Sequence, residues 1–292
     1  MNVVVLGSLN IDFVVRAPRL PSPGETISGE EFTTSAGGKG ANQAVAAARL
    51  GASTKMIGRV GRDVFGDMLL DSLRSDGVDI SAVAIDGETE TGTALITVAD
   101  DGRNSIVVVP GANATVGRTE LDALKSVIEG ADVLLLQLEI PIEVVETAAS
   151  IAASKEVAVI LDPAPARSLP DRLLRHCTWI TPNEREAEIL TGVVVTDQES
   201  VAEAAHRLLT MGSKNVVITL GPRGCYCAFS HEGFFVPAPH VEAIDTVGAG
   251  DAFNGALAVG LAQNRPIRAL LEAACAAGAG ASALRGAQTR SP

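Results

Sequence analysis

Short runs of β-branched and aliphatic residues alternate with longer, alanine-rich stretches along most of the chain. Short continuous apolar runs are typical of strands buried on both faces, and apolar residues spaced by three or four positions are typical of helices. Candidate strands are residues 3–7, 133–138, 157–161, 179–181 and 216–220. Candidate helices are residues 40–50, 141–153, 200–211, 248–262 and 268–283. This alternation predicts an α/β fold with a mostly parallel central sheet covered by helices.

Two segments depart from this rhythm and predict a small β-sheet lid. Residues 13–34 are rich in proline and glycine and contain strand-like pieces, and residues 93–109 resemble a β-hairpin. The predicted large α/β domain then comprises residues 1–12, 35–92 and 110–292. An antiparallel edge added to the main sheet is the alternative, since mixed sheets are common.

Length, charge and cysteine content describe an ordinary protein with a substantial core. The 292 residues suffice for one large domain with an appendage or for two moderate domains. No apolar run reaches the ~18 residues that span a bilayer, and the first residues lack a basic signal-peptide flank, which predicts a cytoplasmic protein. The net charge of −12 opposes nonspecific binding to nucleic acids or anionic membranes. The four cysteines lack zinc-site spacing and are predicted to be buried free thiols.

A glycine-rich turn, Thr246-Val247-Gly248-Ala249-Gly250, leads into Asp251 at the start of the helix predicted at 248–262. Backbone N–H groups are unpaired at a helix start, and glycine lets phosphate oxygens approach the main chain closely. This arrangement suits phosphoryl transfer, with Asp251 as a base beside an anion hole formed by the N–H groups of residues 248–251. The alternative is a helix cap in which the dipole alone favours the aspartate.

A second glycine-rich run, residues 36–43, opens the helix predicted at 40–50, which Gly51 ends. Lys39 and Asn42 lie on neighbouring turns and offer donors that can hold a polyol. The spacing of a Walker loop and a strict dinucleotide-binding fingerprint are both absent, so a nucleotide site must be built in another way. Packing alone is the alternative explanation for such a helix start.

Taken together, these segments match a known family, because the chain resembles the ribokinase-like carbohydrate kinases. The matching segments, in family order along nearly the whole chain, are residues 7–12, 23–26, 37–44, 137–139, 163–167, 181–186, 219–224, 245–251 and 285–288. Residues 248–251 indicate only the superfamily, whereas residues 37–44 together with Asn10 and Asp12 resemble the ribokinases. The resemblance implies a Rossmann-like, ribokinase-like fold and a lid that covers the sugar and pairs two subunits into a homodimer.

The resemblance also implies ATP-dependent phosphorylation of D-ribose at O5, which gives D-ribose 5-phosphate and ADP, with Asp251 as the general base. The sugar-binding positions that it implies are Asn10, Ile11, Asp12, Gly38, Lys39, Gly40, Ala41, Asn42, Glu139 and Asp251. Carboxylates accept hydrogen bonds from sugar hydroxyls, while lysine and asparagine donate them. Considered singly, Asp12 also fits a turn residue, Lys39 a solvated cation and Glu139 a charge at a helix N-terminus.

On the nucleotide side, the resemblance implies the binding positions Asn183, Glu186, Thr219, Leu220, Gly221, Pro222, Arg223, Gly224, Gly248, Ala249, Gly250 and Cys275. The family places the pair Asn183 and Glu186 near the phosphates and Mg²⁺, an ion that commonly keeps several waters. This pair also fits a helix capping box, and residues 221–224 also fit a plain hairpin turn. Cys275 departs from the polar residue that relatives usually have near the adenine, and the relatives usually continue into another helix beyond residue 292.

A monovalent cation, usually K⁺, is a further cofactor that the resemblance implies. The matching positions, which act largely through backbone carbonyls, are Asp245, Val247, Ala281, Leu284, Gly286 and Arg290. Three functions stay open: a ribose kinase, a kinase for another small polyol or a nucleoside, and a sugar-binding sensor without catalysis. The intact Asp251 argues against a sensor, and the polar sugar positions argue against a nucleoside, whereas deoxyribose differs from ribose by only one hydroxyl.

Overall fold

The main sheet forms the centre of the molecule in the computed structural model, which describes residues 1–230, 232–284 and 286–288. Within these residues it has nine strands, from one edge to the other β13 (Glu232–Val236), β12 (Cys225–Phe229), β11 (Asn215–Thr219), β10 (Trp179–Ile180), β9 (Ala158–Leu161), β8 (Val133–Leu136), β1 (Asn2–Leu6), β4 (Ser53–Gly61) and β5 (Asp79–Asp86). The strands from β11 to β5 are parallel, and β12 and β13 add an antiparallel edge. The predicted α/β fold is therefore confirmed.

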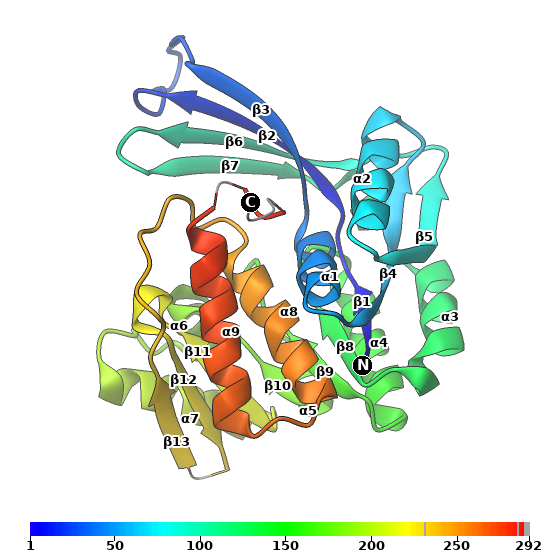
Figure 1. The fold of residues 1–292 in the computed structure, drawn as a ribbon, viewed down its shortest axis with the longest axis vertical. Helices are drawn as coiled ribbons and strands as arrows, with labels where there is room; N and C mark the ends of the chain where they lie inside the picture. Colours follow the sequence, from blue (N-terminus) through cyan, green and yellow to red (C-terminus); the bar gives the residue numbers. More distant parts are fainter. Residues whose placement is uncertain (231, 285, 289–292) are drawn as a thin grey trace.

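Helices cover both faces of this sheet (Figure 1). One face packs against α1 (Lys39–Arg49), α2 (Val64–Ser75), α8 (Ala249–Ala262) and α9 (Ile267–Ser282). The other packs against α3 (Arg118–Val127), α4 (Ile142–Ser154), α5 (Asp171–His176), α6 (Glu184–Thr191) and α7 (Gln198–Met211). Successive side chains of a strand point to opposite faces, so Val3 and Val5 belong to the first layer, while Val4 and Leu6 belong to the second. Burial on both faces explains why these strands are continuous apolar runs.

The smaller sheet is separate from the main one and lies across its end (Figure 1). Its strand order is β3 (Glu31–Gly37), β2 (Asn10–Ala17), β6 (Gly92–Ala99) and β7 (Asn104–Val109), with β2 and β6 parallel and the outer pairs antiparallel. The alternative of an extra edge on the main sheet is therefore wrong. We call this four-stranded sheet the lid sheet. The division of the chain into two domains stays a prediction.

The strands and helices predicted from periodicity agree with observed elements to within two residues at each end. They correspond to β1, β8, β9, β10 and β11 and to α1, α4, α7, α8 and α9. No helix of the described chain is both long enough and apolar enough to cross a membrane. Short 3₁₀ turns at Gly111–Thr115, Ile128–Gly130 and Gly221–Arg223 complete the connections.

Candidate active site

A cavity of about 330 Å³ lies between the carboxyl ends of the parallel strands and the lid sheet. In parallel α/β sheets this edge is the usual ligand site, because the strands end there and the loops after them converge. Polar residues at the end of β11 and after β1, β8, β9 and β10 all reach it. The polar and charged side chains that line it are Asn10, Asp12, Lys39, Asn42, Glu139, Asp162, Thr181, Asn183, Glu186, Thr219, Thr246, Asp251 and Asn254.

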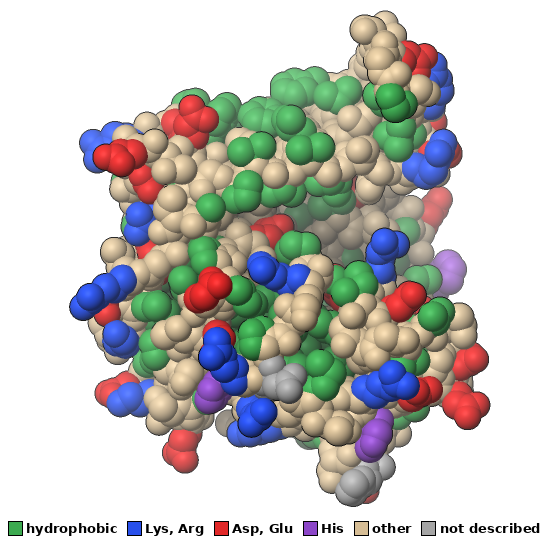
Figure 2. All heavy atoms as spheres, turned by 180° about the vertical axis from the view of Figure 1, so that it is seen from behind, with side chains coloured by type: hydrophobic (Ala, Val, Ile, Leu, Met, Phe, Trp, Pro, Cys, Tyr) green, Lys and Arg blue, Asp and Glu red, His purple; other side chains and the backbone are tan. Residues whose placement is uncertain are grey.

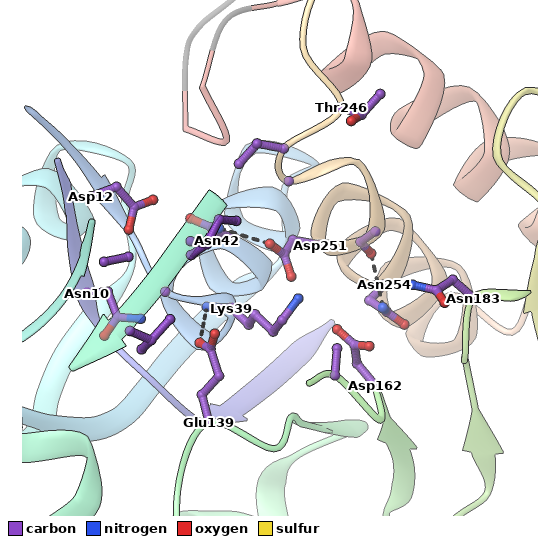
Figure 3. A pocket seen from close by; sticks show the side chains of 18 of the residues that line it. Asn10, Asp12, Lys39, Asn42, Glu139, Asp162, Asn183, Thr246, Asp251 and Asn254 are labelled. Carbon is purple, nitrogen blue, oxygen red and sulfur yellow. Dashed lines mark hydrogen bonds between the residues drawn. The ribbon is translucent and has the colours of Figure 1, made fainter. Parts of the chain in front are cut away.

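Asp251 lies in the middle of this row of polar groups (Figure 3). It is buried in the first turn of α8, and each of its carboxylate oxygens accepts one hydrogen bond from α1. Asn42 Nδ2 donates to Oδ2 at 2.9 Å, and Gln43 Nε2 donates to Oδ1 at 3.1 Å. Burial raises the pKa of Asp251 and outweighs the opposing effects of Lys39, Asn42 and Gln43. A carboxylate with a raised pKa is a stronger base, which suits proton abstraction from a hydroxyl.

The N-terminus of α8 opens beside Asp251 without a side-chain cap. The N-cap Gly248 has φ 79°, a left-handed conformation, and a Cβ there would lie 2.5 Å from Ala287 Cβ. Ala249 N donates to Thr246 O, whereas the N–H groups of Gly250 and Asp251 have no hydrogen-bond partner in the described chain. Two unpaired donors at a helix N-terminus form a favourable position for an anion.

On the lid side, the polar groups are held by the backbone around the start of α1. Glu139 Oε2 accepts hydrogen bonds from Ser8 Oγ at 2.5 Å and from Lys39 N at 3.1 Å. Asn10 Oδ1 accepts from Asn113 Nδ2 at 2.8 Å, so the Asn10 amide group keeps its donors free. The other oxygen of Glu139 is likewise free to accept. The result is a set of donors and acceptors that matches the hydroxyls of a polyol.

Five acids and one lysine line the cavity: Asp12, Glu139, Asp162, Glu186, Asp251 and Lys39. Burial raises the pKa of Asp12 to about 7, and the charges of Glu139 and Asp251 add to the effect. Burial also raises the pKa values of Asp162 and Glu186. Lys39 points toward Asp251 and Asp162 (Figure 3). Burial lowers its pKa, but the surrounding carboxylates outweigh burial and raise it.

Not every predicted sugar position faces the cavity. Asn10, Asp12, Gly38, Lys39, Asn42, Glu139 and Asp251 line it, but Ile11, Gly40 and Ala41 do not. Ile11 and Ala41 are buried in the core, and a Cβ at Gly40 would lie 2.6 Å from Ser8 N. Gly40 therefore permits close packing of α1 against the loop after β1. Gly38 lines the cavity and also permits close packing, since it has φ 87° and approaches Asn10 N closely.

The nucleotide-side residues divide in the same way. Asn183, Glu186, Thr219, Gly248 and Gly250 line the cavity, while Leu220 and Cys275 are buried in the core. The capping box of Asn183 and Glu186 is present, which does not exclude ligand contact because both also face the cavity. Gly221, Pro222, Arg223 and Gly224 form the turn between the antiparallel strands β11 and β12, outside the cavity lining, and Ala249 is also outside it.

The predicted cation positions gather around the loop that precedes α8. Asp245 accepts hydrogen bonds from Val247 N and Gly286 N, both at 3.0 Å, and so ties this loop to the segment after α9. Val247 lines the main cavity, whereas Ala281, Leu284 and Gly286 line a second, mostly apolar cavity of about 340 Å³. Arg290 lies outside the described residues.

Several residues of the site were missed by the sequence prediction. Asp162 directly follows β9, and the rule that placed Glu139 after β8 applies to it equally. Asn254 lies one helical turn after Asp251, and its Oδ1 accepts a hydrogen bond from Thr181 Oγ1 at 2.7 Å. Asn113 gave no such signal, because only the tertiary fold brings it to Asn10.

Comparison with known proteins agrees with this geometry. The model of the pfkB family carbohydrate kinases matches residues 1–292. A ribokinase of Haemophilus influenzae is 40% identical over 290 residues, 99% of this chain and 95% of that protein. A deoxyribokinase of Salmonella typhi is 35% identical, over 94% of this chain and 90% of that protein. The structure of Arabidopsis thaliana ribokinase complexed with ribose and ATP has a TM-score of 0.90 and 34% identity, with 97% of this chain and 93% of that chain covered.

The fold and cavity, taken with the similarity to the ribokinases, identify the class of protein as a phosphotransferase. The chain belongs to the pfkB family of carbohydrate kinases. The resemblance indicated by the sequence motifs is therefore confirmed.

Proposed function

We propose that the protein transfers the γ-phosphoryl group of ATP to O5 of D-ribose and releases D-ribose 5-phosphate and ADP. One observation carries this proposal: Asp251 lies between the polyol-matching groups and the N-terminus of α8 within a single cavity. The similarity to the ribokinases supports ribose and ATP as the substrates. Asn10, Asp12 and Glu139 hold the sugar hydroxyls in this proposal, and Lys39 and Asn42 supply further donors.

In the proposed reaction Asp251 is the general base. It takes the proton of the C5 hydroxyl as O5 forms its bond to the γ-phosphorus, and the bond from that phosphorus to the β–γ bridging oxygen breaks. The N–H groups at the start of α8 stabilise the charge on the moving phosphoryl group, because they are already oriented and need no reorganisation. Lys39, whose side chain points toward Asp251 and Asp162, adds positive charge.

The charge of the cavity favours a divalent cation with the nucleotide. Those of the five acids that are ionised would repel the phosphates of ATP, and bound Mg²⁺ would neutralise part of the phosphate charge. No three His, Cys, Asp or Glu side chains of the described residues form a ready metal site. Mg²⁺ bound with ATP would be held mainly by phosphate oxygens and waters, and Glu186 and Asp162, which both line the cavity, would be its candidate carboxylates. ATP and Mg²⁺ are thus the proposed cofactors.

The test is product formation with three sugars and one variant. We expect wild-type protein with Mg-ATP to release ADP with ribose and to give ribose 5-phosphate by ³¹P NMR. With 5-deoxyribose, which lacks the acceptor hydroxyl, we expect no transfer. A higher kcat/KM for 2-deoxyribose than for ribose would identify a deoxyribokinase instead, the activity named for the Salmonella relative.

The Asp251→Asn variant tests the base. We expect kcat to fall by about 10³-fold, since an amide cannot accept the proton and general base catalysis is typically worth about 10²- to 10⁴-fold. The circular dichroism spectrum should stay that of the wild type. A folded variant that retains near wild-type kcat would show that Asp251 is not the base.

We also propose K⁺ as an activating cation near Asp245. Support comes from the hydrogen bonds of Asp245, which join the loop before α8 to Gly286 and so couple this region to the proposed anion hole. We expect kcat to be several-fold higher in K⁺ than in tetramethylammonium at matched ionic strength. Equal rates in the two salts would contradict the proposal.

Finally, we propose a homodimer formed through the lid sheet. Ile106 and Val108 of β7 line the cavity, so Val107 and Val109 point to the opposite face. Val107 is 58% exposed, and its cross-strand partner Leu95 is 52% exposed. Figure 2 shows hydrophobic side chains gathered over the upper part of the molecule, where the lid sheet lies. Such an exposed apolar face is typical of a subunit interface.

A further inference from the structure

Gln43, in the second turn of α1, has every polar atom of its side chain engaged, although it does not line the cavity. Its Nε2 donates to Asp251 Oδ1 at 3.1 Å and to Asp162 Oδ2 at 2.9 Å. Its Oε1 accepts from Gln137 Nε2 at 2.6 Å. All four side chains are buried, so these contacts are shielded from water and each lost bond leaves a polar group unpaired.

These contacts use the amide of Gln43 in one orientation. Its NH₂ group donates to the two acids on one side, and its carbonyl oxygen accepts from Gln137 on the other. Gln137 is itself buried, and its Oε1, which has no hydrogen-bond partner in the described chain, occupies the space that the absence of a Cβ at Gly7 leaves open. Three hydrogen bonds to three different buried side chains therefore hold the Gln43 amide.

The same contacts fix the carboxylate of Asp251 from both sides. Asn42 holds Oδ2 and Gln43 holds Oδ1, so the carboxylate plane cannot rotate without breaking a buried hydrogen bond. Each oxygen keeps a second acceptor position for a substrate hydroxyl. Asn42 borders the cavity and can exchange partners with a ligand, whereas Gln43 lies behind the carboxylate and cannot.

We infer that Gln43 is a positioning residue that holds Asp251 in the orientation needed to take the sugar proton and joins it to Asp162 in one hydrogen-bonded unit. This inference rests on the proposed role of Asp251 as base. Gln43 contacts neither the sugar nor the nucleotide in this arrangement, so it acts on the chemical step more than on substrate binding.

The Gln43→Met variant tests the inference, because methionine has a similar length but cannot donate. We expect kcat for ribose to fall by about 10- to 100-fold and KM to change by less than about threefold. The acidic limb of the kcat profile should move up by about one pH unit, since a lost donor no longer favours the charged carboxylate. A purely structural role of Gln43 would lower the melting temperature and leave this limb in place.

Two further variants keep the test decisive. Val45→Ala removes a buried side chain from the same helix and should lower the melting temperature without moving the acidic limb. Gln43→Glu preserves size and can still accept from Gln137, but it sets a third acid beside Asp251 and Asp162. We expect it to fold and to move the limb upward as well, so it replaces the methionine variant if that one does not fold.

The outcomes separate this inference from the proposed function. If the wild type is inactive with ribose and ATP, or if Asp251→Asn keeps its kcat, the base assignment fails and the inference fails with it. If Asp251→Asn is inactive while both Gln43 variants keep the wild-type kcat and acidic limb, only the inference is overturned.

Discussion

Asp12 shows how much of the chemistry at this site depends on burial of single residues. It lies on β2, and burial together with Glu139 and Asp251 raises its pKa from 3.8 to about 7. Near neutral pH the side chain therefore changes between a neutral acid that can donate a hydrogen bond and a carboxylate that only accepts. A sugar hydroxyl can form a hydrogen bond with either form. A bound sugar would therefore reduce the unfavourable free energy of burying the ionised carboxylate.

We therefore expect Asp12→Asn to raise the free energy of unfolding, by an amount that depends on pH. The folded state holds the Asp12 proton more tightly than the unfolded chain, so the wild-type free energy of unfolding falls as pH rises from about 4 to about 7. Asparagine removes this decline, and we expect the variant to be more stable by about 2 to 4 kcal/mol at pH 8 but not at pH 4. Urea unfolding at both pH values measures the difference.

The exposed Asp100 at the lid hairpin provides the matched control, since Asp100→Asn should change stability little at either pH. We expect kcat/KM for ribose to fall in Asp12→Asn only. If Asp12→Asn is no more stable than the wild type at pH 8, then burial of the ionised Asp12 does not lower the stability of the wild type.

At the level of single residues, the sequence predicted those that follow strands and missed those that act through tertiary contacts. Asn10, Glu139 and Asn183 lie after strands whose apolar runs were clear, so their convergence followed from the parallel sheet. Asn113 lies in a 3₁₀ turn and reaches Asn10 across a sequence separation of 103 residues. No local pattern encodes such a contact.

Gly248 and Gly250, at the start of helix α8, are predicted to have different roles. Gly248 needs its left-handed φ and its lack of a Cβ, whereas nothing lies within 4 Å of a Cβ built on Gly250. We expect Gly248→Ala to lower the free energy of unfolding by about 2 kcal/mol or more, from backbone strain and the contact with Ala287.

We expect Gly250→Ala to keep or raise stability by up to about 1 kcal/mol, because alanine favours the helix. The added methyl group faces the cavity beside the free N–H groups, so KM for ATP should rise about tenfold. Thermal unfolding and ATP-dependent rates of the two variants, compared side by side, measure both effects. Equal melting temperatures for the two variants would contradict the packing argument.

Elements were predicted well where local sequence and tertiary packing agree. The apolar runs of β1, β8 and β9 are buried on both faces, and α4 and α7 have regular apolar spacing. The unit of β4, α2 and β5 was not predicted. In β4, Gly58 and Gly61 weaken the strand pattern, but both are needed for packing, since a Cβ on Gly58 would lie 2.7 Å from Gly7 O. Only the fold supplies that reason.

For the whole molecule, the lid face leads to a prediction about assembly. We expect wild-type protein to be a dimer by light scattering and Val107→Glu to be a monomer, because a buried unpaired carboxylate would oppose association. Val194, which is 60% exposed outside the lid sheet, provides the control, and Val194→Glu should leave the dimer intact. A wild-type monomer at micromolar concentration would contradict this interface.

The whole-molecule arrangement was only partly accessible from sequence. The parallel sheet and a small lid followed from the alternation of strands and helices and from the two exceptional segments. The strand order did not follow, because β1 pairs with β4 and β8, which lie far along the chain and share no local signal with it. The position of the lid over the carboxyl ends likewise depends on the pairing of β2 with β6.

The hydrogen bonds of Gln288 bear on how the protein should be produced. Gln288 Nε2 donates to Asn42 Oδ1 at 2.9 Å, and the backbone carbonyl oxygen of Gln288 accepts from Arg49 Nη2 at 2.7 Å. This segment therefore contacts Asn42, which in turn donates to Asp251. Met1 and Asn2 instead contact Asp132 at the opposite end of the strands. A purification tag fused after residue 292 would be tethered four positions from Gln288, whereas one fused before Met1 would keep clear of the proposed active site.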